Sequence, residues 1–195
     1  WKKRSFKIMK WFKIFFFIIY VLHLNDLEAS TKNNIIKNFS EIKNLSFNFK
    51  QNINEKTQEG NCLIEYPKKI YCEYKKSKKK LVSNGEKLVI QNLNSNQYYI
   101  YPLEKTAFNL ILDKHFLLNK IKSTKGDLVD NRYLRFKFIE GENQINIFFD
   151  LNSYNLIGWQ NIDLYQNLVI TYLFHLEKNI QIKKGQFKLP SPTNN

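Results

Sequence analysis

The chain has 195 residues, a formal net charge of +14 and an aromatic content of 15%. Two cysteines and three histidines without closely spaced pairs exclude the common zinc motifs, and the sequence has no GxGxxG, Walker loop or HExxH motif. No linker rich in Pro, Gly or Ser divides the chain, so we expect one domain after an N-terminal leader.

Residues 9–29 are typical of a secretory signal peptide. Lys10 and Lys13 precede an apolar run from Ile14 to Leu22, and a polar stretch then ends at Ala29. The apolar run is too short to span a bilayer, although a signal anchor is the alternative. We therefore predict that residues 1–29 form a signal peptide whose true start is Met9, and that residues 30–195 form one exported, strongly basic domain.

The first segment of this domain has helical periodicity. Ile35, Ile36, Phe39 and Ile42 recur at helical spacing after Ser30, which predicts an amphipathic helix over residues 30–42. Residues 45–53 then alternate instead, which predicts a half-buried strand. Phe47 and Phe49 share the apolar face of this strand.

Residues 60–74 predict an antiparallel hairpin that turns at Pro67. Its even positions share one apolar face: Cys62, Ile64, Tyr66, Ile70, Cys72 and Tyr74. The two cysteines are placed opposite each other, close enough for a disulfide, while two buried thiols are the alternative. Because an exported protein meets an oxidising environment, we predict the disulfide.

Short strands continue after a lysine-rich run at residues 75–80, which we interpret as a solvated loop. Residues 87–91 place Leu88 and Ile90 on one face. In the next strand we assign Tyr98 and Ile100 to the interior, because the polar Gln97 shares the face of Tyr99 and Tyr101.

Residues 106–121 return to helical spacing, with Phe108, Ile111, Leu112, His115 and Leu118 on one face. Strand signals resume at 132–139, where Leu134, Phe136 and Phe138 face inward, and continue at 143–150, 155–161 and 167–176. The register of residues 143–150 cannot be assigned, because both of its faces are apolar. The pattern predicts an α+β fold, mainly antiparallel β, with a strongly curved sheet or half-open barrel and helices packed over its concave face.

The sequence offers little for catalysis. Beyond the signal peptide only His115 and His175 are available as bases, and neither belongs to a recognisable nucleophile or metal motif. We therefore predict no enzyme activity, no catalytic residues, no cofactor and no metal. The positive charge suits an anionic partner, either a lipid surface or a nucleic acid.

Several landmarks occur together in a fixed order. They are Phe49-Lys50-Gln51, Gly60, Pro67 with its aromatic strand, LVSNG (81–85), a helix beginning at Thr106, Asp163 to Asn167, and FKLP (187–190). In this combination the chain resembles the outer-membrane lipoprotein carrier family, LolA. The resemblance implies a periplasmic chaperone whose half-open barrel and helical lid enclose the acyl chains of lipoproteins.

The implied partners are acylated lipoproteins, an inner-membrane lipoprotein-releasing transporter, and an outer-membrane receptor or the outer membrane itself, with no nucleic acid and a monomeric carrier. The expected lid residues are Ile35, Ile36, Phe39, Phe108, Ile111 and Leu112. The expected cavity residues are Phe47, Phe49, Ile64, Tyr66, Ile70, Tyr74, Leu88, Ile90, Tyr98, Ile100, Phe136 and Phe138. We expect these side chains to surround an empty hollow, and a solidly packed interior with no room beneath either helix would refute the carrier.

The chain departs from the family before Pro67. The family often carries an arginine there that bonds the lid helices, whereas this chain has Tyr66, which predicts a weaker or different latch. Two other functions stay open from the sequence. One is an envelope sensor of lipids or lipoproteins with the same fold, and the other is a secreted basic nucleic-acid-binding protein.

Overall fold

The computed structural model describes residues 29–141, 143–163 and 165–192. Within these ranges eleven strands form one antiparallel sheet in the order β6-β5-β4-β3-β2-β1-β11-β10-β9-β8-β7. The strands are β1 (Asn44–Ile53), β2 (Lys56–Glu65), β3 (Lys69–Tyr74), β4 (Lys79–Asn84), β5 (Lys87–Asn92), β6 (Gln97–Pro102), β7 (Asp127–Val129), β8 (Tyr133–Glu140), β9 (Asn143–Asp150), β10 (Leu156–Ile162) and β11 (Leu168–Lys178).

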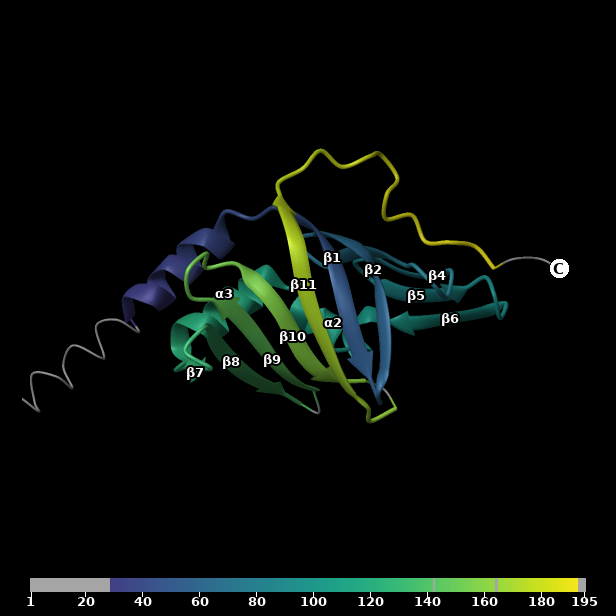
Figure 1. Ribbon diagram of the computed structural model, residues 1–195. Helices are drawn as coiled ribbons and strands as arrows, with labels where there is room; N and C mark the ends of the chain where they lie inside the picture. Colours follow the sequence, from purple (N-terminus) through teal and green to yellow (C-terminus); the bar gives the residue numbers. More distant parts are fainter. Residues whose placement is uncertain (1–28, 142, 164, 193–195) are drawn as a thin grey trace, which may run out of the picture.

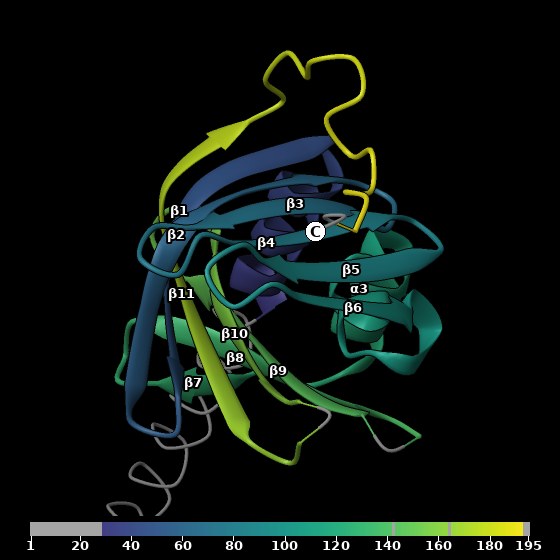
Figure 2. The same cartoon turned by 90° about the vertical axis from the view of Figure 1, so that its right-hand side faces the viewer.

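The sheet curls into a half-open barrel with β6 and β7 at its two free edges (Figures 1 and 2). Its long central pair is β1 with β11, which joins the first strand to the last. On their other sides β1 pairs with β2 and β11 pairs with β10. The first and last strands therefore lie side by side in the middle of the sheet. The predicted fold class is confirmed.

Alternation of apolar and polar residues decides which face of each strand is buried. In β1, Phe47 and Phe49 are 1% and 2% exposed, while Lys50 points outward and is exposed. The hairpin of β2 and β3 pairs Cys62 directly with Cys72, and the two form a disulfide with their Cα atoms 4.1 Å apart. The predicted hairpin and disulfide are therefore confirmed.

The helices lie on one side of the curled sheet. An N-terminal helix is described over residues 29–40, and three further segments follow β6: η1 (Leu103–Lys105), α2 (Phe108–Ile111) and α3 (Lys114–Ser123). Figure 1 shows the N-terminal helix, in purple, beside α3.

The predicted single helix over residues 106–121 is wrong. The side chain of Asp113 accepts a hydrogen bond from the backbone N–H of Phe116 at 2.9 Å and begins a new helix. The interruption resets the helical phase, so that Leu117 and Ile121 are buried in α3 whereas His115 is exposed.

The C-terminal segment crosses the outer face of the sheet. The hydroxyl of Tyr98 donates to the backbone oxygen of Pro190 at 2.8 Å, and the side-chain amide of Gln91 donates to that of Ser191 at 3.2 Å. Val82 and Val89, which pair with each other across β4 and β5, are 1% and 0% exposed although they lie outside the main core cluster. A second, smaller buried layer therefore lies on the outer face of β4 and β5, on the same side of the sheet as the C-terminal segment.

The predicted signal peptide, apart from Ala29, lies outside the described residues. Among the helices that are described, none has both the length and the apolar character to cross a membrane.

Candidate functional site

The concave face of the sheet carries most of the predicted cavity residues. Phe47, Phe49, Ile64, Ile70, Leu88, Phe136 and Phe138 are all 3% exposed or less, and Tyr74 is 7% exposed. Ile90 and Tyr66 are half-buried and pack against the same cluster. The structure therefore brings these residues together on one apolar face, which the N-terminal helix, α2 and α3 cover.

Two lysines join the N-terminal helix to α3, and each bonds the C-terminal end of the opposite helix. Lys32 near the start of the N-terminal helix donates to the backbone oxygens of Lys122 and Thr124, at 2.8 and 2.9 Å. Lys114 at the start of α3 donates to the backbone oxygens of Ser40 and Ile42, at 3.0 and 2.8 Å. Each lysine thus neutralises the negative C-terminal end of the opposite helix, which ties the two helices into one lid.

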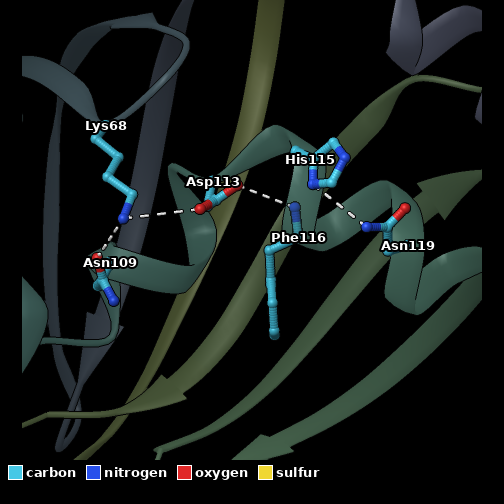
Figure 3. Close-up of polar contacts among 6 residues, drawn as sticks. All are labelled: Lys68, Asn109, Asp113, His115, Phe116 and Asn119. Carbon is cyan, nitrogen blue, oxygen red and sulfur yellow. Dashed lines mark hydrogen bonds and ion pairs between the residues drawn. The ribbon is translucent and has the colours of Figure 1, made fainter.

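A second set of contacts fastens this lid to the hairpin of β2 and β3. The ammonium nitrogen of Lys68 lies 3.1 Å from Oδ1 of Asn109 and 3.7 Å from Oδ2 of Asp113 (Figure 3). The backbone N–H of Lys68 also donates to the backbone oxygen of Leu112 at 2.9 Å. Because Asp113 caps α3, Lys68 holds the lid at the junction of α2 and α3.

Tyr66 does not act as the latch. Its hydroxyl is fully buried and has no hydrogen-bond partner among the described residues, and burial raises the pKa of this phenol above its ordinary value. The latch is instead made by Lys68, two positions later on the other side of Pro67. The sequence contains no signal for this, since Lys68 is one of several lysines in the region.

Phe39 on the N-terminal helix connects the two halves of the curled sheet. Its ring packs edge to face against Tyr66 at the β2–β3 turn and against Phe149 on β9, with both centroid distances 5.7 Å. The side chain is 1% exposed. Aromatic pairs of this kind add to the stabilisation that comes from burial, so Phe39 acts as the main apolar anchor of the lid.

The prediction of an open hollow beneath the lid is wrong for this structure. Ile35, Leu112, Phe136 and Phe149 are 0% exposed, so no water-sized space adjoins these side chains. Two pockets, of about 330 and 240 Å³, lie elsewhere, one beside the β3–β4 turn and one around Gly158 on the opposite side of the strands. The lid helices bury their apolar stripes by filling the concave face themselves.

The predicted orientation of β6 is also wrong. Tyr101 and Tyr99 pair with Leu88 and Ile90, so they share the inner face, whereas Ile100 is 52% exposed. The hydroxyl of Tyr98 is bonded to the C-terminal segment on the outside. The prediction depends on Gln97 as a polar residue that marks the outer face. Its side-chain oxygen instead accepts a hydrogen bond from the hydroxyl of Ser95 within the same turn.

A row of buried polar side chains crosses the inner face. The hydroxyl of Tyr74 donates to Oε1 of Gln51 at 3.3 Å, and Nε2 of Gln51 donates to Oγ1 of Thr171 at 3.1 Å. Thr171 is paired across the strands with Trp159, whose indole nitrogen is buried without a partner among the described residues.

One lysine lies against this row. The ammonium nitrogen of Lys79 is 3.6 Å from the centre of the Tyr74 ring and 2.7 Å from Oε1 of Gln58. Burial lowers the pKa of Lys79 to about 8. The predicted solvated loop over residues 75–80 is therefore wrong for its last two residues, since Lys79 and Lys80 begin β4 and are half-buried.

The described part of the chain holds no cluster of three or more His, Cys, Asp or Glu side chains that suits a metal ion. His115 and His175 each form a hydrogen bond with an asparagine side chain through Nδ1, at 3.3 and 3.1 Å. The candidate site is an apolar face with a fastened helical cover.

The family model of the outer membrane lipoprotein carrier protein LolA matches residues 40–190. The chain belongs to the LolA family. The match covers the whole sheet, α2 and α3, and its last residue falls at Pro190 in the C-terminal segment. A comparison with curated proteins finds no match.

Solved structures of low sequence identity are also similar. They include an uncharacterised conserved protein from Thermus thermophilus, with TM-score 0.49, 7% identity and coverage of 84% of this chain and 94% of the other. A LolA superfamily protein from Nitrosomonas europaea has TM-score 0.41, 8% identity and coverage of 80% and 97%. The complex of MucA and MucB from Pseudomonas aeruginosa gives TM-score 0.46, 10% identity and coverage of 83% and 61%.

Several residues of the site were not found from the sequence. Ile145, Ile147 and Phe149 of β9 line the inner face, but their strand is apolar on both faces. Trp159 lies in a segment that was recognised as a strand without an assigned face. Only the pairing with neighbouring strands decides these orientations.

Proposed function

We propose that this protein is a periplasmic carrier that encloses the acyl chains of lipoproteins between its curved sheet and its lid, and carries them from the inner to the outer membrane. Residues 30–195 serve as one exported carrier domain, without enzyme activity. The observation that supports this best is the large aromatic inner face covered by a separate helical lid. Membership of the LolA family supports the same function.

The filled interior excludes the carrier expected from the sequence, whose hollow is permanently open, so the carrier proposed here requires a second state with the lid displaced. Acyl chains have no room while Phe39, Ile35 and Leu112 occupy the concave face, so the lid must move before a ligand enters. The ion pairs of the lid are partly exposed, as at Lys68 with Asp113 and Lys120 with Glu140. Contacts of this kind are each worth about 1 kcal/mol or less, so a ligand that replaces the apolar contacts of the lid can displace it.

Burial of acyl chains supplies enough free energy for this exchange. Each methylene group removed from water contributes about 0.8 kcal/mol, so a ligand with two or three acyl chains has more than enough to offset the opening of the lid. The same magnitude makes release into water negligible. We therefore expect handover to another apolar site or to a membrane by direct contact.

The test is to express the exported protein, purify residues 30–195 and identify bound material by mass spectrometry. Recovery of acylated lipoprotein supports the carrier. Protein free of lipid that also fails to take up a synthetic diacyl lipopeptide would refute it. Binding of oligonucleotides under the same conditions would favour the nucleic-acid alternative.

A further inference from the structure

Two polar groups inside the apolar site have no hydrogen-bond partner within the described part of the chain. Five buried side-chain atoms lack a hydrogen bond among the described residues, and three of them belong to Ser77, Arg135 and Asn146, which lie outside the main core cluster. The other two are the hydroxyl of Tyr66 and the indole nitrogen of Trp159. Buried polar groups are almost always hydrogen-bonded in folded proteins, so each of these two needs an explanation.

Both groups are donors placed among apolar side chains. Trp159 is 3% exposed on β10 and packs edge to face against Phe47, with ring centroids 6.1 Å apart. Tyr66 packs edge to face against Phe39 of the lid. The two phenylalanine rings offer no strong acceptor, and the hydroxyl of Thr171, which is paired with Trp159, already accepts a hydrogen bond in the polar row. A ligand can therefore supply the acceptor that both donors lack among the described residues.

The nearby donors that are satisfied make the contrast clear. Tyr74 is buried in the same face, yet its hydroxyl is bonded to Gln51, and Gln51 is bonded in turn to Thr171. The inner face therefore contains acceptors where they are used within the protein. Tyr66 and Trp159 lie outside this row of bonds.

We propose that Tyr66 and Trp159 donate hydrogen bonds to the carbonyl oxygens at the heads of ester-linked or amide-linked acyl chains. This inference rests on the proposed carrier function and specifies how the ligand is recognised. A hydrocarbon chain alone provides no acceptor for these donors. A free carboxylate provides one but introduces an unpaired charge into an apolar interior, so the neutral ester or amide is the matching group.

The closed lid is consistent with this role. Phe39 occupies the space against the ring of Tyr66, so displacement of the lid both opens that space and frees the phenol for a ligand. Trp159 is held on a strand of the sheet rather than on the lid, and it is level with Gln51 of β1 through their common partner Thr171. Tyr66 lies toward the other end of β1, where its backbone N–H donates to the backbone oxygen of Lys43, so the two donors offer separate points for a carbonyl.

The experiment compares two lipopeptide probes with equal chain lengths, one with two ester-linked palmitoyl chains on a cysteine and the other with two ether-linked hexadecyl chains. Their affinities are measured for the wild-type protein and for Tyr66→Phe, Trp159→Phe and Tyr98→Phe. The ether probe reports any effect of packing, because it has no carbonyl. Tyr98→Phe is the matched control, since it removes a hydroxyl that already has a partner, Pro190, on the outer face of the sheet.

We expect the wild-type protein to bind the ester probe about tenfold more tightly than the ether probe, the effect of one or two hydrogen bonds. Tyr66→Phe and Trp159→Phe should each reduce this preference about threefold or more, whereas Tyr98→Phe should preserve it. Tyr66→Phe should leave the thermal midpoint unchanged or raise it, because it removes an unpaired polar group. This variant keeps the shape of the ring, so it carries the test even if Trp159→Phe folds poorly.

Three results would overturn the inference in distinguishable ways. Equal affinity of the wild-type protein for the two probes refutes carbonyl recognition but leaves the carrier function intact. A preference that survives in both variants shows that other groups are responsible. Failure of the wild-type protein to bind either probe refutes the carrier function and this inference together.

Discussion

Lys68 and Asp113 join the β2–β3 turn to the start of α3, with Nζ of Lys68 3.7 Å from Oδ2 of Asp113. The two residues are far apart in the sequence, and the pairing places the cation of this contact beside the residue that caps the helix. The lid is therefore fastened at the point where its helical segment is interrupted. Both side chains are about one third exposed, so the contact holds the lid without locking it.

Lys68→Met should loosen α2 and α3. The change removes the bonds to Asn109 and Asp113 but keeps most of the side chain, and we expect a loss of stability of about 0.5 to 1 kcal/mol. Hydrogen exchange of the amides in residues 106–123 should become faster. Lys69→Met is the matched control, because Lys69 pairs with Glu65 at 3.0 Å on the same hairpin and does not reach the lid. Equal exchange in the two variants would show that Lys68 is not the latch.

Phe39→Ala should unseat the N-terminal helix. It removes a side chain that is 1% exposed and contacts both halves of the sheet, and substitutions of this kind lower stability by roughly 3 to 5 kcal/mol. Urea denaturation measures the loss, and limited proteolysis reports release of the helix. Phe174→Ala, at a position that is 38% exposed, should lower stability by less than about 1 kcal/mol. Similar losses for the two variants would contradict an anchoring role for Phe39.

The disulfide between Cys62 and Cys72 should stabilise the hairpin that carries the latch. The cysteines are 10 residues apart, and a loop of this size is worth about 2 to 3 kcal/mol in the chain-entropy account. Replacing both cysteines by alanine should lower the urea midpoint by a corresponding amount. Mass spectrometry should show a gain of about two daltons when the wild-type protein is reduced. No gain in mass would mean that the thiols are free.

Lys79→Met should stabilise the protein near neutral pH. The folded state lowers the pKa of Lys79 to about 8, below the ordinary value of about 10.4, because burial disfavours the charged amine. The penalty is therefore fully present below pH 8 and is relieved as the pH rises toward 10.4, where the unfolded chain also loses the proton.

The expected gain at pH 7 is about 1 kcal/mol, since the contact with the Tyr74 ring offsets part of the burial penalty. The difference between variant and wild type should shrink between pH 8 and 10, as measured by urea denaturation at each pH. Lys75→Met serves as the control, because Lys75 is exposed in the turn that precedes β4. A gain that is independent of pH would show that burial of the charge is not its cause.

The spacing of apolar residues along the sequence determined the features that depend only on residues close together in the chain. The alternation around Phe47 and Phe49 fixed the buried face of β1, and the symmetry of Cys62 and Cys72 about Pro67 fixed both the hairpin and its disulfide. These patterns are reliable because a strand has a period of two, so a few residues are enough to define its apolar face.

Only the tertiary structure decided the rest. β6 is aromatic on both faces, so its orientation follows from its pairing with Leu88 and from the C-terminal segment that binds Tyr98. The latch at Lys68 and the filling of the concave face by Phe39 depend on residues that meet across the closed fold. A local pattern shows which side chains are apolar, but the contacts of a lid with its sheet are set by register, curvature and packing, which the whole chain determines together.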